Sequence, residues 1–354
     1  MIAFTSLLGI EHPIIQGPFG GGLSSVGLAA AVSNAGGPGS FGAHHLPPTQ
    51  IGEVIRELKT ATARPFNINL WVSRHDAGAE VMTAAHQEQG MRQFGEVYAR
   101  LGVEAPSLEP PDDFSFEQQA EVVLEMRPAV FSFVFGIPDA AILQACRRRG
   151  IRTLGAATTV EEAAALDEAG VDMIVATGSD AGGHRPSFLR RAEDSLTGTF
   201  SLVPQVRKVT RRPVIAAGGI AEARGMSAAF QLGADAVQIG TAFLACEESN
   251  CPAPHRAALF TPEASCTRLS RHFTGRLARF MINPLLAELE GGTHPALPFP
   301  LQAALNHPVK AEGVRRGDAS LLPLYAGQAA PLIEHRRAAD LMRHLVAALS
   351  ASRD

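Results

Sequence analysis

Short apolar runs alternate with segments of helical periodicity along the first two thirds of the chain. The alternation predicts eight strands, at Pro13–Gln16, Gly39–Gly42, Phe66–Leu70, Ala129–Phe133, Arg152–Ala156, Met173–Ala176, Val214–Ala217 and Ala236–Ile239. Most of these runs are apolar nearly throughout, which is typical of parallel strands that are buried on both faces.

The segments between the apolar runs carry the signals of helices. Apolar residues within 51–58 recur at i, i+3, i+4 and i+7, so one face of a helix is predicted to be buried there. Ser115 with Gln118, and Thr159 with Glu162, have the spacing of a capping box at a helix N-terminus.

A weak internal repeat supports regular strand–helix units. Ala169–Val175 parallels Leu232–Gln238, because each segment ends a helix on glycine, turns and enters a strand. Eight such units favour an α/β fold of the (β/α)8 barrel type, whose ligand site lies at the C-terminal ends of the strands. A doubly wound sheet remains the alternative, because alternation alone does not prove that the sheet closes.

Two stretches interrupt this rhythm and indicate a second unit. Residues 71–115 are too long for a simple connection, and residues 247–330 lack strand signals and consist of helical patterns and Pro-rich loops. We expect these two stretches to form a smaller, mainly helical cap beside a barrel made of residues 1–70 and 116–246. A last helix at 331–350 is expected to return to the barrel wall.

Composition narrows the function classes. The chain has 354 residues, 46% of them hydrophobic, and a formal net charge of −4. No basic run is long enough to follow a phosphate backbone, so we expect no nucleic-acid partner. The four cysteines form no CxxC pair, and neither a signal peptide nor a long uncharged apolar run is visible. We therefore expect a cytoplasmic protein with reduced thiols and no membrane span.

The most informative segment for chemistry is Val175–Arg185, which follows a predicted strand directly. The adjacent glycines Gly182 and Gly183 allow backbone amides to approach a flat ligand closely. His184 then stands where an imidazole can hydrogen-bond to a substrate or exchange a proton near neutral pH. A tight turn that merely exposes a histidine would give the same pattern.

Two glycine-containing turns follow the last two predicted strands. Ala216–Ile220 contains Gly218 and Gly219, and Gln238–Ala242 contains Gly240. Backbone N–H groups at a helix N-terminus bind anions, and the loops after strands seven and eight of a barrel commonly hold phosphate. Each turn alone would be ordinary, but the two together predict a phosphate site.

Two further features follow other strand ends. The glycine-rich segment Gln16–Ser25, with Ser24 or Ser25 as a helix N-cap, matches neither GxGxxG nor a Walker motif. A backbone edge lying beside a ring system suits the barrel better. Asn69 ends the third strand, where its amide either has a structural partner or faces the ligand.

On these motifs the chain resembles the nitronate monooxygenases, formerly called 2-nitropropane dioxygenases. These are FMN enzymes with a TIM barrel and a smaller helical domain. The resemblance runs through nearly the whole chain, in segments 13–18, 32–37, 180–184, 217–220, 240–243, 273–276 and 326–328. The Asp180–His184 segment is the most specific of these, since Gly-Gly-Ile and Gly-Thr pieces recur across many phosphate-binding barrels.

The resemblance implies a set of roles. FMN contacts are implied for Gly17, Pro18, Phe19, Asn69, Thr177, Gly182, Gly183, Gly218, Gly219, Gln238, Ile239, Gly240 and Thr241. His184 is the implied catalytic residue. The implied reaction oxidises a nitronate or nitroalkane with dioxygen to a carbonyl compound and nitrite, and it needs no metal. The protein acts on a small molecule, and a homo-oligomer is compatible with the family.

Three residues depart from the family pattern. Thr177 stands where the family usually has glutamine, Asp180 where it usually has glutamate, and Pro186 where glycine is common. These departures put the substrate in question more than FMN binding. Two other functions remain open. One is a flavin-dependent enoyl-acyl carrier protein reductase that uses NAD(P)H, and the other is a non-catalytic flavin-binding barrel.

Overall fold

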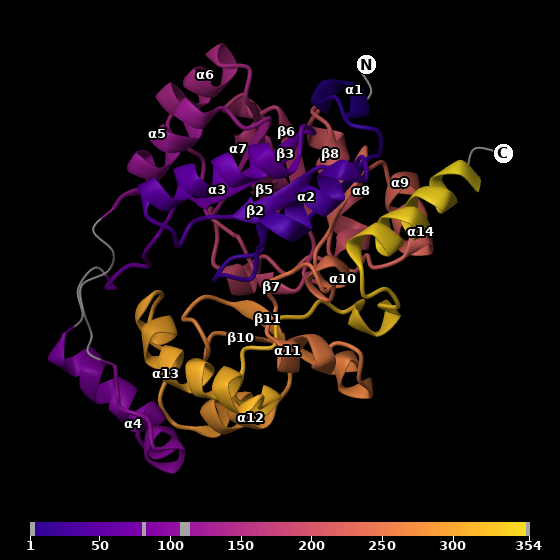
Figure 1. Cartoon of the computed structure of the whole chain (residues 1–354). Coiled ribbons are helices and arrows are strands. Elements are labelled where there is room, and N and C mark those ends of the chain that lie inside the picture. The colour runs from indigo at the N-terminus through magenta and orange to yellow at the C-terminus, as the bar shows by residue number, and fades with distance from the viewer. Residues whose placement is uncertain (1–3, 80–82, 107–113, 352–354) are drawn as a thin grey trace.

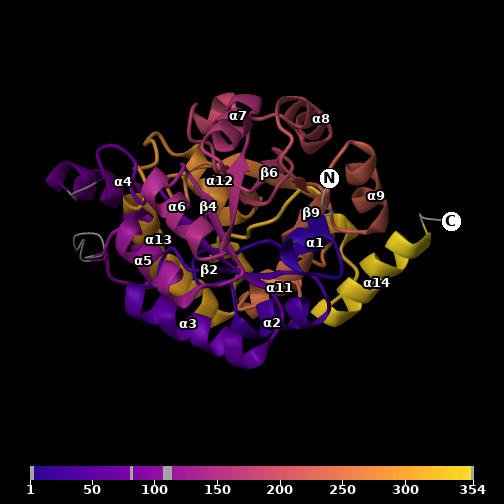
Figure 2. The same cartoon turned by 90° about the horizontal axis from the view of Figure 1, so that it is seen from above.

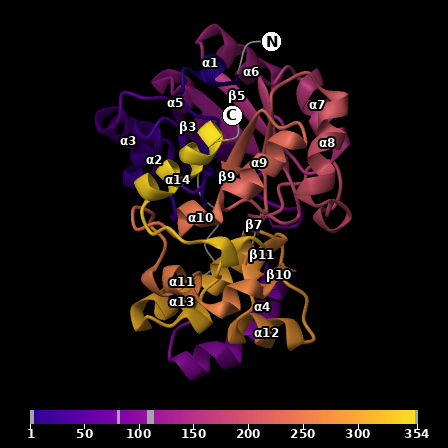
Figure 3. The ribbon, with the colours of Figure 1, turned by 90° about the vertical axis from the view of Figure 1, so that its right-hand side faces the viewer.

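The computed structural model describes residues 4–79, 83–106 and 114–351 (Figure 1). A barrel forms one end of the molecule, and a smaller layer of helices with a short sheet lies below it (Figure 3). Within the described ranges, no helix combines the length and apolarity that crossing a membrane requires.

Eight parallel strands make the barrel: β1 (Ile14–Gln16), β2 (Gly39–Gly42), β3 (Phe66–Trp71), β4 (Val130–Val134), β5 (Arg152–Ala157), β6 (Met173–Thr177), β8 (Val214–Ala217) and β9 (Ala236–Ile239). Their hydrogen-bonded order is β1-β9-β8-β6-β5-β4-β3-β2. The predicted (β/α)8 barrel is confirmed, and the doubly wound alternative is wrong. Each strand lies within a residue of its predicted bounds, because a short apolar run between helices is a local signal.

The barrel closes between β1 and β2 through polar groups. The Gln16 N–H donates to the Pro38 carbonyl at 3.2 Å, and the Gln16 Oε1 accepts from the Ser40 N–H at 2.7 Å. The same polar layer continues inside the barrel, where Asn69 Nδ2 donates to Ser132 Oγ at 2.9 Å. Because buried polar groups need such partners, this layer explains the polar residues within otherwise apolar strands.

Helices surround the barrel when it is seen from above (Figure 2). They are α2 (Val26–Asn34), α3 (Pro48–Ala61), α5 (Phe116–Met126), α6 (Ala140–Arg148), α7 (Val160–Glu168), α8 (Thr199–Val209), α9 (Ala223–Gln231) and α14 (Ala338–Ala351), while α1 (Phe4–Leu8) packs at the N-terminal end of the strands. The predicted apolar face of α3 is buried, and Ser25 rather than Ser24 caps α2. Helix α14 packs on α2 and α9. It begins at residue 338 rather than 331, after the short 3-10 turn η4 (Ala330–Leu332).

The two predicted capping boxes differ in outcome. Ser115 and Gln118 form both halves of the box at the start of α5. At α7 only Thr159 makes its bond. The Glu162 carboxylate instead accepts from the Thr158 N–H at 2.6 Å and the Phe188 N–H at 2.6 Å. Glu162 therefore holds the loop that follows His184, a role that the helix pattern did not indicate.

The cap contains α4 (Ala84–Leu101), α11 (Ala253–Ala258), α12 (Pro284–Gly291) and α13 (Leu301–Arg316). The prediction that strands are absent after residue 246 is wrong. Strands β10 (Thr267–Ser270) and β11 (Ala278–Met281) pair antiparallel, and β7 (Gly183–His184) from the barrel loop joins β11. Both β10 and β11 are short and carry an arginine, so no apolar alternation marked them. A separate apolar cluster, which includes Phe94, Tyr98, Phe273, Phe280 and Leu305, holds α4 against these elements.

Candidate active site

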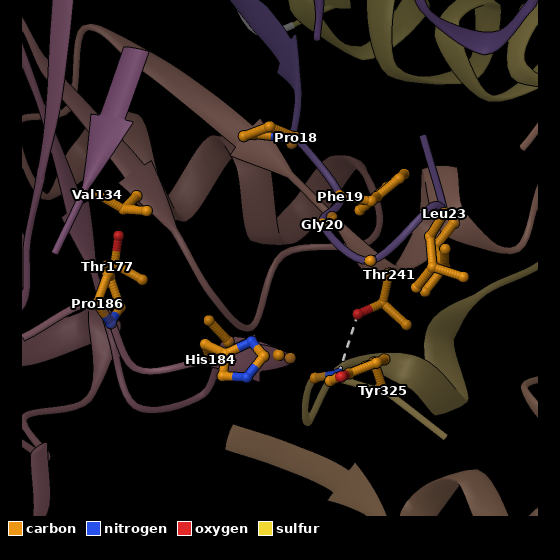
Figure 4. A pocket seen from close by; sticks show the side chains of 18 of the residues that line it. Pro18, Phe19, Gly20, Leu23, Val134, Thr177, His184, Pro186, Thr241 and Tyr325 are labelled. Atoms are coloured by element: carbon orange, nitrogen blue, oxygen red, sulfur yellow. Dashed lines mark hydrogen bonds between the residues drawn. The ribbon is translucent and has the colours of Figure 1, made fainter. Parts of the chain in front are cut away.

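A cavity of about 510 Å³ lies where the C-terminal strand ends meet the cap. The residues predicted for the site gather there: Gly17, Pro18, Phe19, Asn69, Thr177, Gly182, Gly183, His184, Gly218, Gly219, Gln238, Gly240 and Thr241 all line it. Figure 4 shows several of them around one space. The exception is Ile239, whose side chain is fully buried in the core. Its neighbours Gln238 and Gly240 face the cavity, as expected from the alternation of residues along a strand.

The predicted phosphate loops border the cavity as a glycine cradle, and the first of them requires glycine at position 218. Gly218 has a φ of 106°, and a Cβ there would lie 2.7 Å from Thr199 Oγ1. Within the described ranges, the N–H groups of Gly219 and Gly240 donate to no protein acceptor. Both glycines line the cavity, and amides without a protein acceptor suit an anion such as a phosphate.

The N-terminus of α9 does not take part in this cradle. The Glu222 carboxylate accepts from the amides of Arg224 and Gly225, at 2.9 and 2.8 Å. This helix end is therefore neutralised by its own cap. The first amides of α9 are therefore not available to an anion, whereas the turn before α10 (Thr241–Leu244) and the Gly218–Gly219 loop line the cavity.

The cavity fits a planar cofactor with a single phosphate. The edge formed by Gly17, Pro18 and Phe19 borders it, and Asn69 reaches it from the barrel interior while keeping Ser132 as its partner. Asn69 therefore has a structural partner and also lines the cavity. The amides of Gly219 and Gly240 would hold the phosphate end of such a ligand. The edge formed by Gly17, Pro18 and Phe19 would lie against its ring system.

His184 is held on β7 with one ring nitrogen already engaged. Its Nε2 lies 3.0 Å from Thr274 Oγ1, and that hydroxyl donates its only proton to the Arg276 carbonyl at 3.2 Å. Thr274 therefore accepts from His184, and Nε2 carries the imidazole proton. Nδ1 makes no hydrogen bond within the described ranges, so its lone pair is the free acceptor of the ring.

The protonation state of His184 follows from its surroundings. Burial, with the nearby positive charge of Arg276, lowers the pKa of His184 to about 3. The ring is therefore neutral near pH 7, because both effects disfavour a second positive charge. A neutral ring with a free Nδ1 can accept a hydrogen bond or a proton from a substrate, although so low a pKa means that the bound substrate must raise it for efficient proton transfer.

Aromatic rings form the wall around His184. Trp71 lies 5.1 Å from the His184 ring, edge on, and Tyr325 lies 5.9 Å away. The Arg276 guanidinium lies within 5.4 Å of the Trp71 ring and 4.2 Å of the Phe135 ring. Its Nε also donates to Asp76 at 2.8 Å. A cation held this way fixes several rings at once.

The sequence prediction missed His44 and His45, which line the cavity from the loop after β2. The His44 ring is stacked on Trp71 at 3.8 Å with an interplanar angle of 4°. Burial and neighbouring positive groups hold the pKa of His44 well below its ordinary value. Both histidines follow shortly after the predicted strand Gly39–Gly42. His184 was singled out because its segment follows a predicted strand, and the same criterion would have identified His44 and His45.

Three residues of α13 were also missed. Asn306, His307 and Lys310 line the cavity from the cap side. The Asn306 Oδ1 is buried and has no partner in the described part of the chain, and burial lowers the pKa of Lys310. Nothing in a helix pattern shows that this face of α13 turns toward the barrel.

The three departures from the family pattern fall in different places. Thr177 and Pro186 line the cavity, so both can change its shape. Asp180 instead accepts from the Thr199 N–H at 2.6 Å and caps the start of α8. The buried Arg185 donates to the carbonyls of Thr177 and Gly178, which holds the whole loop rigid.

Comparisons of sequence and of structure point to one family. A family model described as nitronate monooxygenase matches residues 2–348. A nitronate monooxygenase from Paraburkholderia phytofirmans is 40% identical over 99% of this chain and 95% of its own length. One from Pseudomonas aeruginosa is 39% identical over 97% of both chains. The solved nitroalkane oxidase from Streptomyces ansochromogenes has a TM-score of 0.90 and 37% identity, covering 99% of this chain and 98% of its own.

Proposed function

Because the chain belongs to the nitronate monooxygenase family, we propose that it oxidises nitronates and nitroalkanes with FMN and dioxygen to a carbonyl compound and nitrite. The observation that carries this proposal is the position of His184. Its free, neutral Nδ1 faces the same cavity as the glycine cradle. A base and a cofactor site that share one enclosed space are what such an oxidation needs.

The choice of FMN rests on the size and chemistry of the cradle. The amides of Gly219 and Gly240 provide room for one phosphate, and the sequence has no dinucleotide fingerprint. When bound, the flavin supplies the redox chemistry by accepting electrons from the substrate and passing them to dioxygen. Gly17 to Phe19 and Asn69 would lie along its ring system.

His184 handles the proton of a nitroalkane. The Cα–H bond breaks, its electron pair delocalises into the nitro group, and the proton forms a bond with Nδ1. The Thr274 hydroxyl keeps accepting from Nε2–H, so the ring does not turn during the transfer. A preformed nitronate needs no such step, because its carbon has already lost the proton, and His184 then stays neutral beside the anion.

The aromatic wall excludes water from this step. Trp71, Phe135, Phe273 and Phe299 line the cavity, and Tyr325 closes it beside His184. With little water present, hydrogen bonds and charges act on the substrate through a low effective dielectric. The wall also favours small, partly apolar substrates over highly charged ones.

The decisive experiment starts from the visible spectrum of the purified protein and continues without oxygen. We expect bound FMN, bleaching by propionate 3-nitronate, and nitrite with oxygen uptake once air is admitted. Bleaching by NADH alone would favour the enoyl-acyl carrier protein reductase. A bound flavin that neither nitronate nor NADH reduces would favour the non-catalytic barrel, and failure to bind micromolar FMN would refute all three.

A further inference from the structure

We propose that His44 is a second catalytic residue, whose Nε2–H donates a hydrogen bond to the nitro oxygens of the substrate while His184 takes the proton. The proposal rests on the proposed function and deepens it. The two imidazoles would then act in opposite senses on one substrate, one as a donor and the other as an acceptor.

The hydrogen-bonding state of His44 points to the donor role. Its Nδ1 is buried and has no partner among the described residues. A proton on Nδ1 would be an orphaned buried N–H, which costs about 1–3 kcal/mol. We therefore assign the proton of the neutral ring to Nε2, which is not among the buried nitrogens that lack a partner in the described residues, on a side chain that lines the cavity.

The position of His44 is fixed by its neighbours. The ring is stacked flat on Trp71, and the same indole meets His184 edge on at 5.1 Å. At the Cε1 edge of the ring, Gly20 leaves the space that the imidazole needs, because a Cβ there would lie 2.5 Å from His44 Cε1. One indole thus holds both imidazoles at the same cavity, and neither ring needs to move when a substrate arrives.

The charges around His44 favour an anion beside it. The groups that act on it are His45, His184, Arg74 and Arg276, and each of them lowers its pKa. No carboxylate is among them. His44 consequently stays a neutral donor near pH 7, in a region of positive potential that suits a nitronate.

The chemistry gives this donor a defined task. As the Cα–H bond breaks and Nδ1 of His184 gains the proton, negative charge develops on the two nitro oxygens. A preorganised N–H aimed at developing charge in a dry site is worth about 10²–10³ in rate. His184 cannot supply it, because its own N–H is committed to Thr274.

The test compares two variants of the FMN-loaded enzyme. His44→Phe keeps an aromatic ring against Trp71 and removes the donor, whereas His44→Gln keeps an N–H. We expect His44→Phe to retain FMN, to lose about 10² in kcat/KM on nitroethane, and to bind nitrate about tenfold more weakly when followed by the flavin spectrum. His44→Gln should recover part of both losses. His335→Phe, which removes another imidazole with a buried unpartnered nitrogen, should change neither.

Two outcomes would overturn the proposal. One is a His44→Phe enzyme with full FMN content and with kcat/KM and nitrate affinity within about twofold of wild type. The other is a His44→Gln enzyme whose kcat/KM and nitrate affinity are no higher than those of His44→Met. Gln and Met have similar lengths and differ in the N–H donor, so this pair also tests the proposal if His44→Phe does not fold. Should wild type fail to oxidise nitronates, the proposed function is wrong, and nitrate affinity still decides the role of His44.

Discussion

Lowering the pH from 7 to 5 should destabilise the folded protein through three histidines that the structure keeps neutral. The pKa of His184 is lowered to about 3 and that of His255 to about 4, while that of His44 is also well below its ordinary value. In each case burial is the largest cause. Unfolding exposes these rings to water, where the imidazole pKa is about 6.5.

The sign and size follow from proton linkage. Between the folded and unfolded pKa values the unfolded chain binds more protons, so stability is fully present above about pH 6.5 and is lost as the pH falls toward the folded values. At pH 5 an unfolded imidazole is almost fully protonated, which costs about 2 kcal/mol per histidine. His184 and His255 together should remove about 4 kcal/mol, a large part of the stability of many domains, and His44 acts in the same direction.

Urea unfolding at pH 7 and pH 5, followed by circular dichroism at fixed FMN concentration, measures this loss. His255→Gln keeps a donor for the Tyr325 carbonyl, which His255 Nε2 approaches at 3.0 Å. It should reduce the loss between the two pH values by about 2 kcal/mol. The same change at the exposed His344 should leave it unaltered. A total loss below about 2 kcal/mol would mean that these rings are protonated in the folded protein, and the neutral base assigned to His184 would be wrong.

Three further predictions concern the site. Gly240→Ala should fold normally, because its Cβ would meet only Phe19 at 4.0 Å. The methyl group would instead occupy the anion cradle and weaken FMN binding at least about tenfold by fluorescence titration, and unchanged affinity would place the phosphate elsewhere. His184→Ala should retain FMN and lose about 10²–10⁴ in kcat/KM on a neutral nitroalkane, but less on the preformed nitronate. Equal losses on both would make His184 a positioning residue. Thr177→Gln should raise activity on small nitronates relative to wild type, because the longer side chain fills space beside the flavin site. If the ranking of substrates in steady-state assays is unchanged, residues of the cap rather than Thr177 set the specificity.

Local sequence patterns were sufficient for the barrel. Each of its strands is a short apolar run between helical segments, and this pattern depends only on residues that are neighbours in the sequence. The sheet of β7, β10 and β11 is different, because its pairing joins His184 to Ala278. Neither segment has a strand pattern of its own, and only packing of the cap onto the barrel brings them together.

The location of the site was also determined by the sequence. Parallel strands end at the same rim, so residues that follow them, such as Thr177 and Gly218, had to meet at one cavity. Ile239 was misplaced because the side chains of a strand alternate between faces, and it took the face opposite Gln238 and Gly240.

Only the tertiary structure decided what the site residues can do. The proton of His184 lies on Nε2 because Thr274, ninety positions away in the chain, accepts it. His44 is held as it is because Trp71, from another strand, lies flat against it. Protonation and orientation depend on partners that are distant in sequence, and such partners meet only in the folded chain: His44 and Trp71 through the pairing of β2 with β3, and His184 and Thr274 through the packing of the cap on the barrel.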